Sequence, residues 1–212
     1  MIDPASAGSF ILEWLGLFKN LQAKFDGRTN LPIEIQDICD ALVAMGYQDE
    51  IRVVSEEMDL TQLLGAYAQW REPNGVYAEP KWVSLIVYPS NVEPMRQRLI
   101  CAKELVHVCD SHVAKTNDPK EIMELAEVLS NRGTIPEGMQ ITGMKVATDV
   151  LAQGKALMLL FPKAARIIAR QQIADGTLTI DRIEEICQIP RETLVDLLDP
   201  EWEEIANLLA SI

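Results

Sequence analysis

Hydrophobic residues in the first part of the chain recur at helical spacing. From Phe10 onward, apolar residues stand three or four positions apart, which predicts a helix over residues 9–25 that begins near a serine cap. Residues 33–45 repeat this spacing, and Gly46 is the expected C-terminal cap of the second helix. The chain is therefore predicted to open with two helices.

The pattern then changes to short runs of β-branched and aromatic residues. Residues 51–54 and 82–88 are such runs, and turn residues separate them, so a small sheet is predicted within residues 51–89. Pro94 stands where a first helical turn would begin, and residues 95–113 carry an apolar stripe. A helix is predicted to follow the sheet directly.

Helical patterns fill the rest of the chain. The predicted segments are a helix over 118–129, a loop over 132–142, an apolar helix over 144–161 that Pro162 interrupts, a helix from there to about 174, and helices over 180–187, over 191–198 and from 201. The expected fold is α+β: mostly helical, with a small three-stranded or similar sheet packed on the helix over 95–113. We predict a main domain over residues 1–174 and an acidic helical extension over residues 175–212.

The net charge of the chain indicates which classes of molecule it can bind. The chain has 19 basic and 32 acidic residues, a formal net charge of −13. Residues 181–212 alone hold nine acidic and two basic residues, a net −7. Such a surface repels phosphate backbones and anionic lipids, so we expect no direct nucleic-acid binding and no membrane association. A protein partner is expected instead, and the sequence does not indicate an oligomeric state.

The cysteines and the hydropathy of the chain predict its location in the cell. The four cysteines are widely scattered, as expected for free thiols in a reducing compartment. The most apolar stretch, residues 156–161, is far shorter than the roughly 20 residues that a membrane span needs. No basic start leads into an apolar signal segment before Phe10. A cytoplasmic location is therefore expected.

The predicted helix over 95–113 carries the sequence Lys103-Glu104-Leu105-Val106-His107. In zinc peptidases with the pattern His-Glu-x-x-His, two histidines one turn apart bind the metal, and the glutamate between them acts on the metal-bound water. Lys103 and His107 hold the two histidine positions here, and Glu104 holds the general-base position. The spacing of that site is kept, but its first ligand is replaced by lysine.

The surroundings of this pentapeptide resemble the ImmA/IrrE-type metallopeptidase-like family. That family typically has an N-terminal helix pair, a small sheet, an arginine-rich lead into the metal-binding helix, and a later helix with an acidic metal ligand that ends in Leu-Leu-x-Pro. Arg96 and Arg98 match the lead, and Leu159-Leu160-Phe161-Pro162 matches the ending. The resemblance covers roughly residues 33–162 and implies a zincin-like core in which His107 and Asp149 would be metal ligands and Glu104 the catalytic base.

Lysine at position 103 changes what this resemblance implies. An ammonium group about 4 Å from a divalent ion is repelled by about 8 kcal/mol at an effective dielectric constant of about 20. We therefore expect no cofactor, with zinc as the alternative. In one interpretation, the Lys103 ammonium takes the place of the metal and pairs with Asp149 or Glu104. In the other, Lys103 lies on a solvated helix face.

Two further groups of residues resemble binding sites, but for each the sequence favours packing or protein contact. The histidines at 107 and 112 stand near Cys101, Cys109 and Asp110, but helical spacing separates these side chains, so buried cysteine packing is favoured over a second metal site. The helices over 180–187 and 191–198 have helix-turn-helix proportions. Their acidic side chains favour packing or protein contact over DNA binding.

Three functional hypotheses follow. The first is a catalytically degenerate metallopeptidase-like protein that acts as a regulatory or protein-binding module. The second is a zinc-dependent endopeptidase that acts on a protein substrate such as a transcriptional regulator, by analogy with the family. The third is a structural subunit of a larger assembly. The sequence leaves enzymatic activity open and favours its absence, because of Lys103.

Overall fold

The computed structural model describes residues 17–58, 65–75, 78–109 and 143–211, with the side chains of 143–149 and of 211 excepted. The predicted helix over 118–129 and loop over 132–142 lie outside the described residues, as does the start of the first helix before Leu17.

The described elements confirm the mixed α+β class. The helices are α2 (Leu17–Phe25), α3 (Ile35–Ala44), α4 (Pro94–Val106), the 3-10 turn η1 (His107–Cys109), α6 (Gly143–Leu160), α7 (Lys163–Ala174), α8 (Ile180–Cys187), α9 (Arg191–Leu198) and α10 (Trp202–Ser211). The strands are β1 (Glu50–Glu56), β2 (Ala66–Glu72) and β3 (Lys81–Pro89). The fold is mostly helical with a small three-stranded mixed sheet, as predicted.

Local sequence signals account for most element ends. Gly46 and Gly176 adopt positive φ angles of 91° and 67°, which glycine tolerates without steric cost, and they follow α3 and α7 closely. Pro94 is the first residue of α4, and Pro162 separates α6 from α7. One end was predicted wrongly: α4 stops at Val106 and continues only as the short turn η1.

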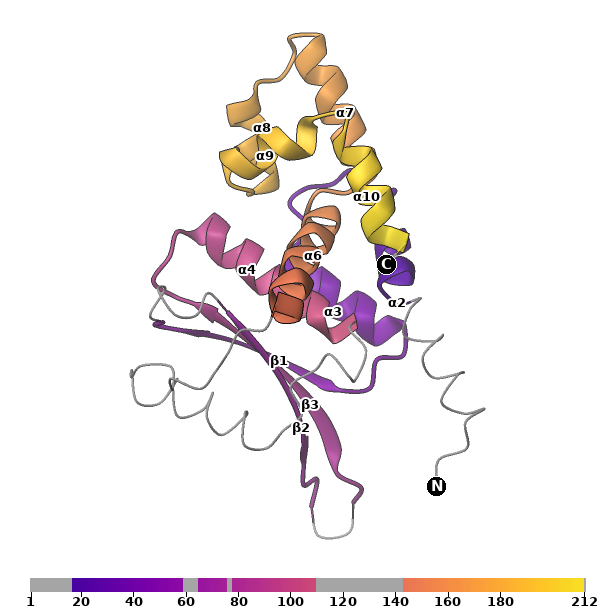
Figure 1. Ribbon diagram of the computed structural model, residues 1–212, viewed down its shortest axis with the longest axis vertical. Helices are drawn as coiled ribbons and strands as arrows, with labels where there is room; N and C mark the ends of the chain where they lie inside the picture. Colours follow the sequence, from indigo (N-terminus) through magenta and orange to yellow (C-terminus); the bar gives the residue numbers. More distant parts are fainter. Residues whose placement is uncertain (1–16, 59–64, 76–77, 110–142, 212) are drawn as a thin grey trace.

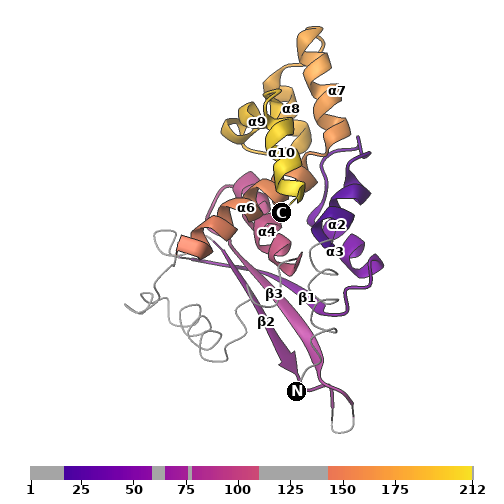
Figure 2. The same ribbon diagram turned by 45° about the vertical axis from the view of Figure 1, so that its right-hand side comes forward.

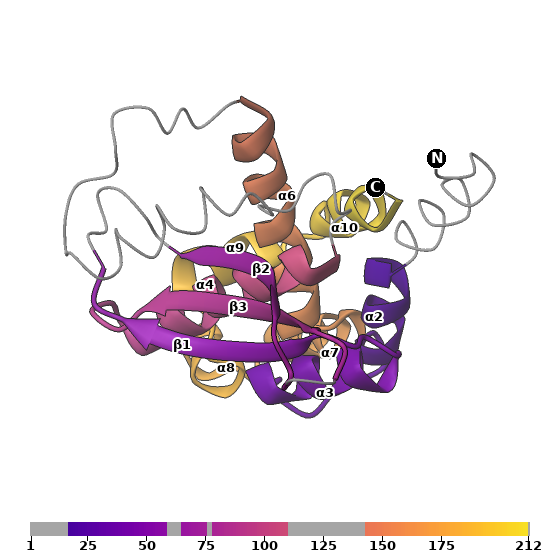
Figure 3. The same ribbon diagram turned by 90° about the horizontal axis from the view of Figure 1, so that it is seen from below.

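The sheet has the strand order β1-β3-β2. β1 runs parallel to the central strand β3, and β2 runs antiparallel to it (Figure 3). In each strand, alternate residues lie on the same face of the sheet. Gln69 is opposite Ser84 in the β2 register, and Tyr67 is opposite Ile86. One face of the sheet therefore presents Tyr67, Gln69, Ser84 and Ile86 together.

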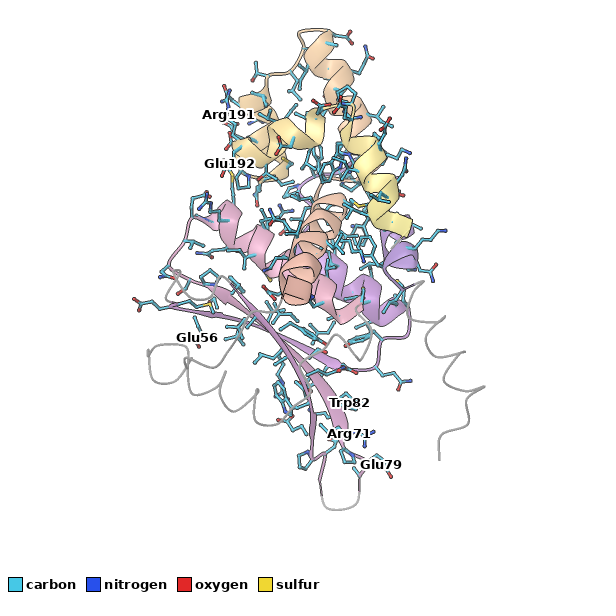
Figure 4. The ribbon with its side chains drawn as sticks, viewed as in Figure 1. Glu56, Arg71, Glu79, Trp82, Arg191 and Glu192 are labelled. Carbon is cyan, nitrogen blue, oxygen red and sulfur yellow. The ribbon has the colours of Figure 1, made fainter. Side chains whose placement is uncertain are left out.

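Helices cover that face. α4 packs against β3, and α6 packs against α4 on the side away from the sheet (Figures 1 and 2). β2 and β3 extend beyond the helices as a hairpin, on which the Arg71 guanidinium lies 4.8 Å from the ring centre of Trp82 (Figure 4). α4, the helix that carries the motif Lys103-Glu104-Leu105-Val106, thus lies between the sheet and α6. We call it the motif helix, and the sheet packs on it as predicted.

The hydrophobic core is continuous from the first described helix to the last. A single cluster of buried residues includes Phe25 of α2, Leu105 of α4, Leu159 of α6 and Leu194 of α9. The helices α7 to α10 form a group above α4 and α6 in Figure 1. The division at residue 174 stays a prediction, and the core shows that the two predicted parts share apolar contacts.

Arg98 joins the motif helix to the C-terminal helices. Its guanidinium donates hydrogen bonds to the carbonyls of Cys187 (2.8 Å) and Gln188 (3.1 Å) at the end of α8, and to the carbonyl of Ile33. Cations are favoured at a helix C-terminus because carbonyls there lack helical partners. Partial burial lowers the pKa of Arg98, and the side chain links these segments of the fold. The sequence pattern predicts that Arg96 and Arg98 form a solvated helix start; this is wrong for Arg98, whereas Arg96 is exposed.

None of the helices in the described part of the chain combines the length and the apolar character that a membrane span requires.

Candidate functional site

The motif residues lie at the C-terminal end of α4, where the helix meets the sheet. Gln97 of α4 binds the loop that precedes this helix, because its Nε2 donates hydrogen bonds to the carbonyls of Ser90 (3.0 Å) and Val92 (2.8 Å). From Cys101 to Val106 every residue of α4 is buried. Lys103 to Val106 therefore lie between layers of the fold, whereas His107 is partly exposed.

Lys103 and Glu104 form an ion pair in this buried segment. The Lys103 Nζ to Glu104 Oε1 distance is 2.9 Å, and the two residues are only 8% and 3% exposed. Neighbouring residues on an α-helix point about 100° apart, so the contact requires the long lysine stem to fold toward the carboxylate. The interpretation in which Lys103 lies on a solvated face is wrong, because the helix face that carries it is covered.

A glycine lets the sheet approach this pair. A Cβ atom on Gly65, immediately before β2, would lie 2.6 Å from Glu104 Oε1 and 2.7 Å from Ile100 Cγ2. Real Cβ atoms do not approach so closely, so the backbone contact depends on glycine at this position. The sequence contains no local signal for it, since the partner residues are about 40 positions away.

His107 lies one helical turn beyond Lys103, but outside α4. It is the first residue of η1, and its ring centre is 6.3 Å from that of Tyr67 on β2, with the rings inclined by 35°. In the His-Glu-x-x-His pattern, both histidines project from one continuous helix. Here the helix tightens at the second position, and the imidazole lies beside an aromatic residue of the sheet.

A partly buried polar network continues from Tyr67 along the sheet. Oδ2 of Asp49 accepts hydrogen bonds from Tyr47 Oη (2.8 Å), Ser84 Oγ (2.9 Å) and Gln69 Nε2 (2.5 Å). The hydroxyl of Tyr67 is 3.2 Å from the same Ser84 Oγ. Ser84 is fully buried, so its hydroxyl cannot reach a substrate and serves to join the strands to the loop after α3.

The sequence patterns did not predict this hydrogen-bond network. Burial is the main cause that raises the pKa of Tyr47, followed by the neighbouring Tyr67, so its phenol stays protonated at every physiological pH. The available signals were a serine inside the apolar run of β3 and polar residues at alternate positions of β2. Neither signal identifies Asp49 as the shared acceptor, because Asp49 lies before β1.

The described side chains do not fit a zinc ion at the motif. A zinc site needs at least three protein ligands, and no group of three or more histidine, cysteine or acidic side chains is close enough among the described residues. The Lys103 ammonium is already 2.9 Å from the carboxylate that would serve a metal-bound water. The side chain of Asp149, and the residues Asp110 and His112, lie outside the described residues, so Asp149 as a metal ligand stays a prediction.

The described cysteines have the properties of buried thiols. None of Cys39, Cys101, Cys109 and Cys187 is in a disulfide bond, and all four are buried. Burial raises the pKa of Cys101 to about 12, and it raises those of Cys39 and Cys187 to about 11. Nucleophilic attack needs the thiolate, so these three buried thiols are unsuited to that chemistry in the folded chain.

Comparisons of the chain with models of protein families, with curated proteins and with solved structures found no match.

Proposed function

We propose that this chain is a catalytically degenerate metallopeptidase-like protein that acts by binding a protein partner. The observation that carries the proposal is the buried ion pair of Lys103 with Glu104 at 2.9 Å. A buried carboxylate requires a compensating positive charge or proton. In an active zinc peptidase the metal supplies that charge, and in this chain the ammonium of Lys103 supplies it.

The same pair explains why the motif would persist without catalysis. Removing one partner of a buried ion pair costs about 3–5 kcal/mol, because the other charge is left without compensation. The Glu104 side chain also fills the space that a Cβ at position 65 would occupy, so it packs beside the start of β2. The motif thus has a structural role that is independent of any reaction.

Charge and cysteine state support the remaining parts of the proposal. The net charge of −13 favours a protein partner over direct contact with nucleic acid or with an anionic membrane. Four buried cysteines without a disulfide bond suit a reducing compartment, so we infer a cytoplasmic location.

The test is to restore the missing ligand. Lys103→His and Lys103→Met both remove the ammonium, and only the histidine variant can bind metal at this position. We expect zinc to raise the melting temperature of Lys103→His, because zinc replaces the lost charge, and to leave Lys103→Met and the unmodified chain unchanged. Scanning calorimetry with and without zinc, with elemental analysis of the same samples, measures this effect.

Two results would contradict the proposal. Stoichiometric zinc in the unmodified chain that disappears in His107→Ala would show a metal site of the endopeptidase type. A Lys103→His variant that gains no zinc while remaining folded would show that the motif does not have the register of a metallopeptidase site.

A further inference from the structure

A groove separate from the motif lies between α6, α9 and α10. Its volume is about 430 Å³. Its lining includes Val150 and Leu157 of α6, Glu192 and Asp196 of α9, and Trp202 and Ile205 of α10. α9 and α10 are consecutive in the chain, whereas α7 and α8 separate them from α6, and the three helices lie together in Figures 1 and 2.

The groove has an apolar floor and exposed apolar walls. Leu157, Trp202 and Leu209 are buried at its base, whereas Val150 and Ile205 are 66% and 49% exposed. α6 and α10 meet closely beneath it, because a Cβ atom on Gly154 would lie 2.6 Å from Leu209 Cδ1. Exposed apolar walls over a packed floor are typical of a surface that buries a partner's apolar side chains.

The rim of the groove is acidic. Asp196 and Glu192 lie on α9, and Glu192 is visible at the edge of that helix in Figure 4. Glu192 is 3.4 Å from Arg96, but both side chains are more than 60% exposed, so this pair is weak and a partner can compete for it. The surrounding residues 181–212 carry nine acidic and two basic residues.

This charge distinguishes between possible occupants. A second copy of the chain would bring the same acidic helices near each other, and like charges placed close together oppose association. A partner with lysine or arginine beside its apolar residues would be attracted instead.

We propose that this groove binds an amphipathic helix of a protein partner, with apolar side chains in the groove and basic side chains at the α9 rim. The proposal rests on the proposed function, because it locates the protein binding assigned there. Anchors at positions i, i+3 or i+4, and i+7 of the partner helix would contact Ile205 and Val150, while its basic flank would face Asp196.

The probe is a synthetic peptide of about 18 residues, long enough for about five helical turns. It contains only leucine and lysine, with the leucines on one helical face. A scrambled peptide of the same composition has no apolar face and is the matched control. Calorimetric titration into the full chain at about 0.15 M salt suppresses non-specific attraction between exposed charges.

We expect saturable binding of the amphipathic peptide that is at least about tenfold tighter than binding of the scrambled peptide. Val150→Asp and Ile205→Asp should each weaken it by about tenfold or more. Asp196→Lys should weaken it as well, without placing a charge on the apolar walls. Ile173→Asp on α7 adds the same charge at a residue that is 37% exposed and outside the groove lining, and it should leave the affinity unchanged.

Equal affinity for the two peptides, or equal effects of Ile173→Asp and Ile205→Asp, would overturn the proposal. Concentration-dependent dimerisation that Ile205→Asp abolishes would assign the groove to a second copy of the chain and would also overturn it. The zinc experiment on Lys103 does not involve the groove. Failure of the docking proposal and failure of the degenerate-peptidase proposal are therefore distinguishable.

Discussion

Replacement of Glu203 by glutamine should loosen the attachment of α10 to α7. Glu203 accepts hydrogen bonds from Arg166 at 3.1 and 3.2 Å and from Arg170 at 2.8 Å. The side chain of Arg166 is only 2% exposed, and it also donates to the Phe161 carbonyl. Glutamine keeps the size of glutamate but removes its charge, and its NH₂ group faces a donor of arginine.

The expected loss follows from these exposures. Removing one partner of a fully buried ion pair costs about 3–5 kcal/mol. Glu203 is 23% exposed, and glutamine retains one acceptor, so we expect a decrease of about 2–3 kcal/mol in the free energy of unfolding. For a chain of this length, about 1 kcal/mol corresponds to about 2–4 °C. The melting temperature should therefore fall by roughly 5–10 °C.

Acid should remove this difference between the unmodified chain and the variant. Burial alone would raise the pKa of Glu203, but the hydrogen bonds and charges of Arg166 and Arg170 outweigh it and lower the pKa. A lowered pKa in the folded state gives stability that is present above the unfolded value, about 4.3, and is lost as the pH falls through the folded value. Glu203→Gln should consequently approach the stability of the unmodified chain at low pH.

Urea unfolding at neutral pH and in acid measures both effects, with Glu204→Gln as the matched control. Glu204 is the next residue of α10 and is exposed, so its substitution should change the free energy of unfolding by less than about 0.5 kcal/mol. Equal stabilities of the two variants at neutral pH would refute the reasoning, as would a difference that grows in acid.

Two further predictions concern the motif helix and the thiols. Gly65→Ala should destabilise the chain by about 1–3 kcal/mol, because its Cβ would overlap Glu104 and Ile100, whereas Gly27→Ala has open space; comparable unfolding midpoints for the two variants would contradict the close approach. A thiol reagent at pH 8 should modify the buried cysteines only at the rate of unfolding and should modify all four in denaturant. Rapid native labelling of Cys39, Cys101 or Cys187 would disagree with their raised pKa values.

The sequence alone determined the order and class of the described helices and of strands β1 and β3, whereas it predicted a three-stranded or similar sheet without locating β2. Helical spacing, β-branched runs and the residues Gly46, Pro94 and Pro162 act through the local backbone, so they predicted helices, strands and most of their ends. It also showed that Lys103 and Glu104 stand side by side in the motif, because adjacent residues are visible in any sequence.

Only the tertiary structure decided the environment of those residues. A periodic pattern shows which side chains share a helix face, but it does not show what covers that face. The burial of Lys103 depends on distant segments, and so do the approach of Gly65 to Glu104 and the convergence of three donors on Asp49. The groove beside Trp202 likewise exists because α6, α9 and α10 pack together, and such long-range packing has no local sequence signal.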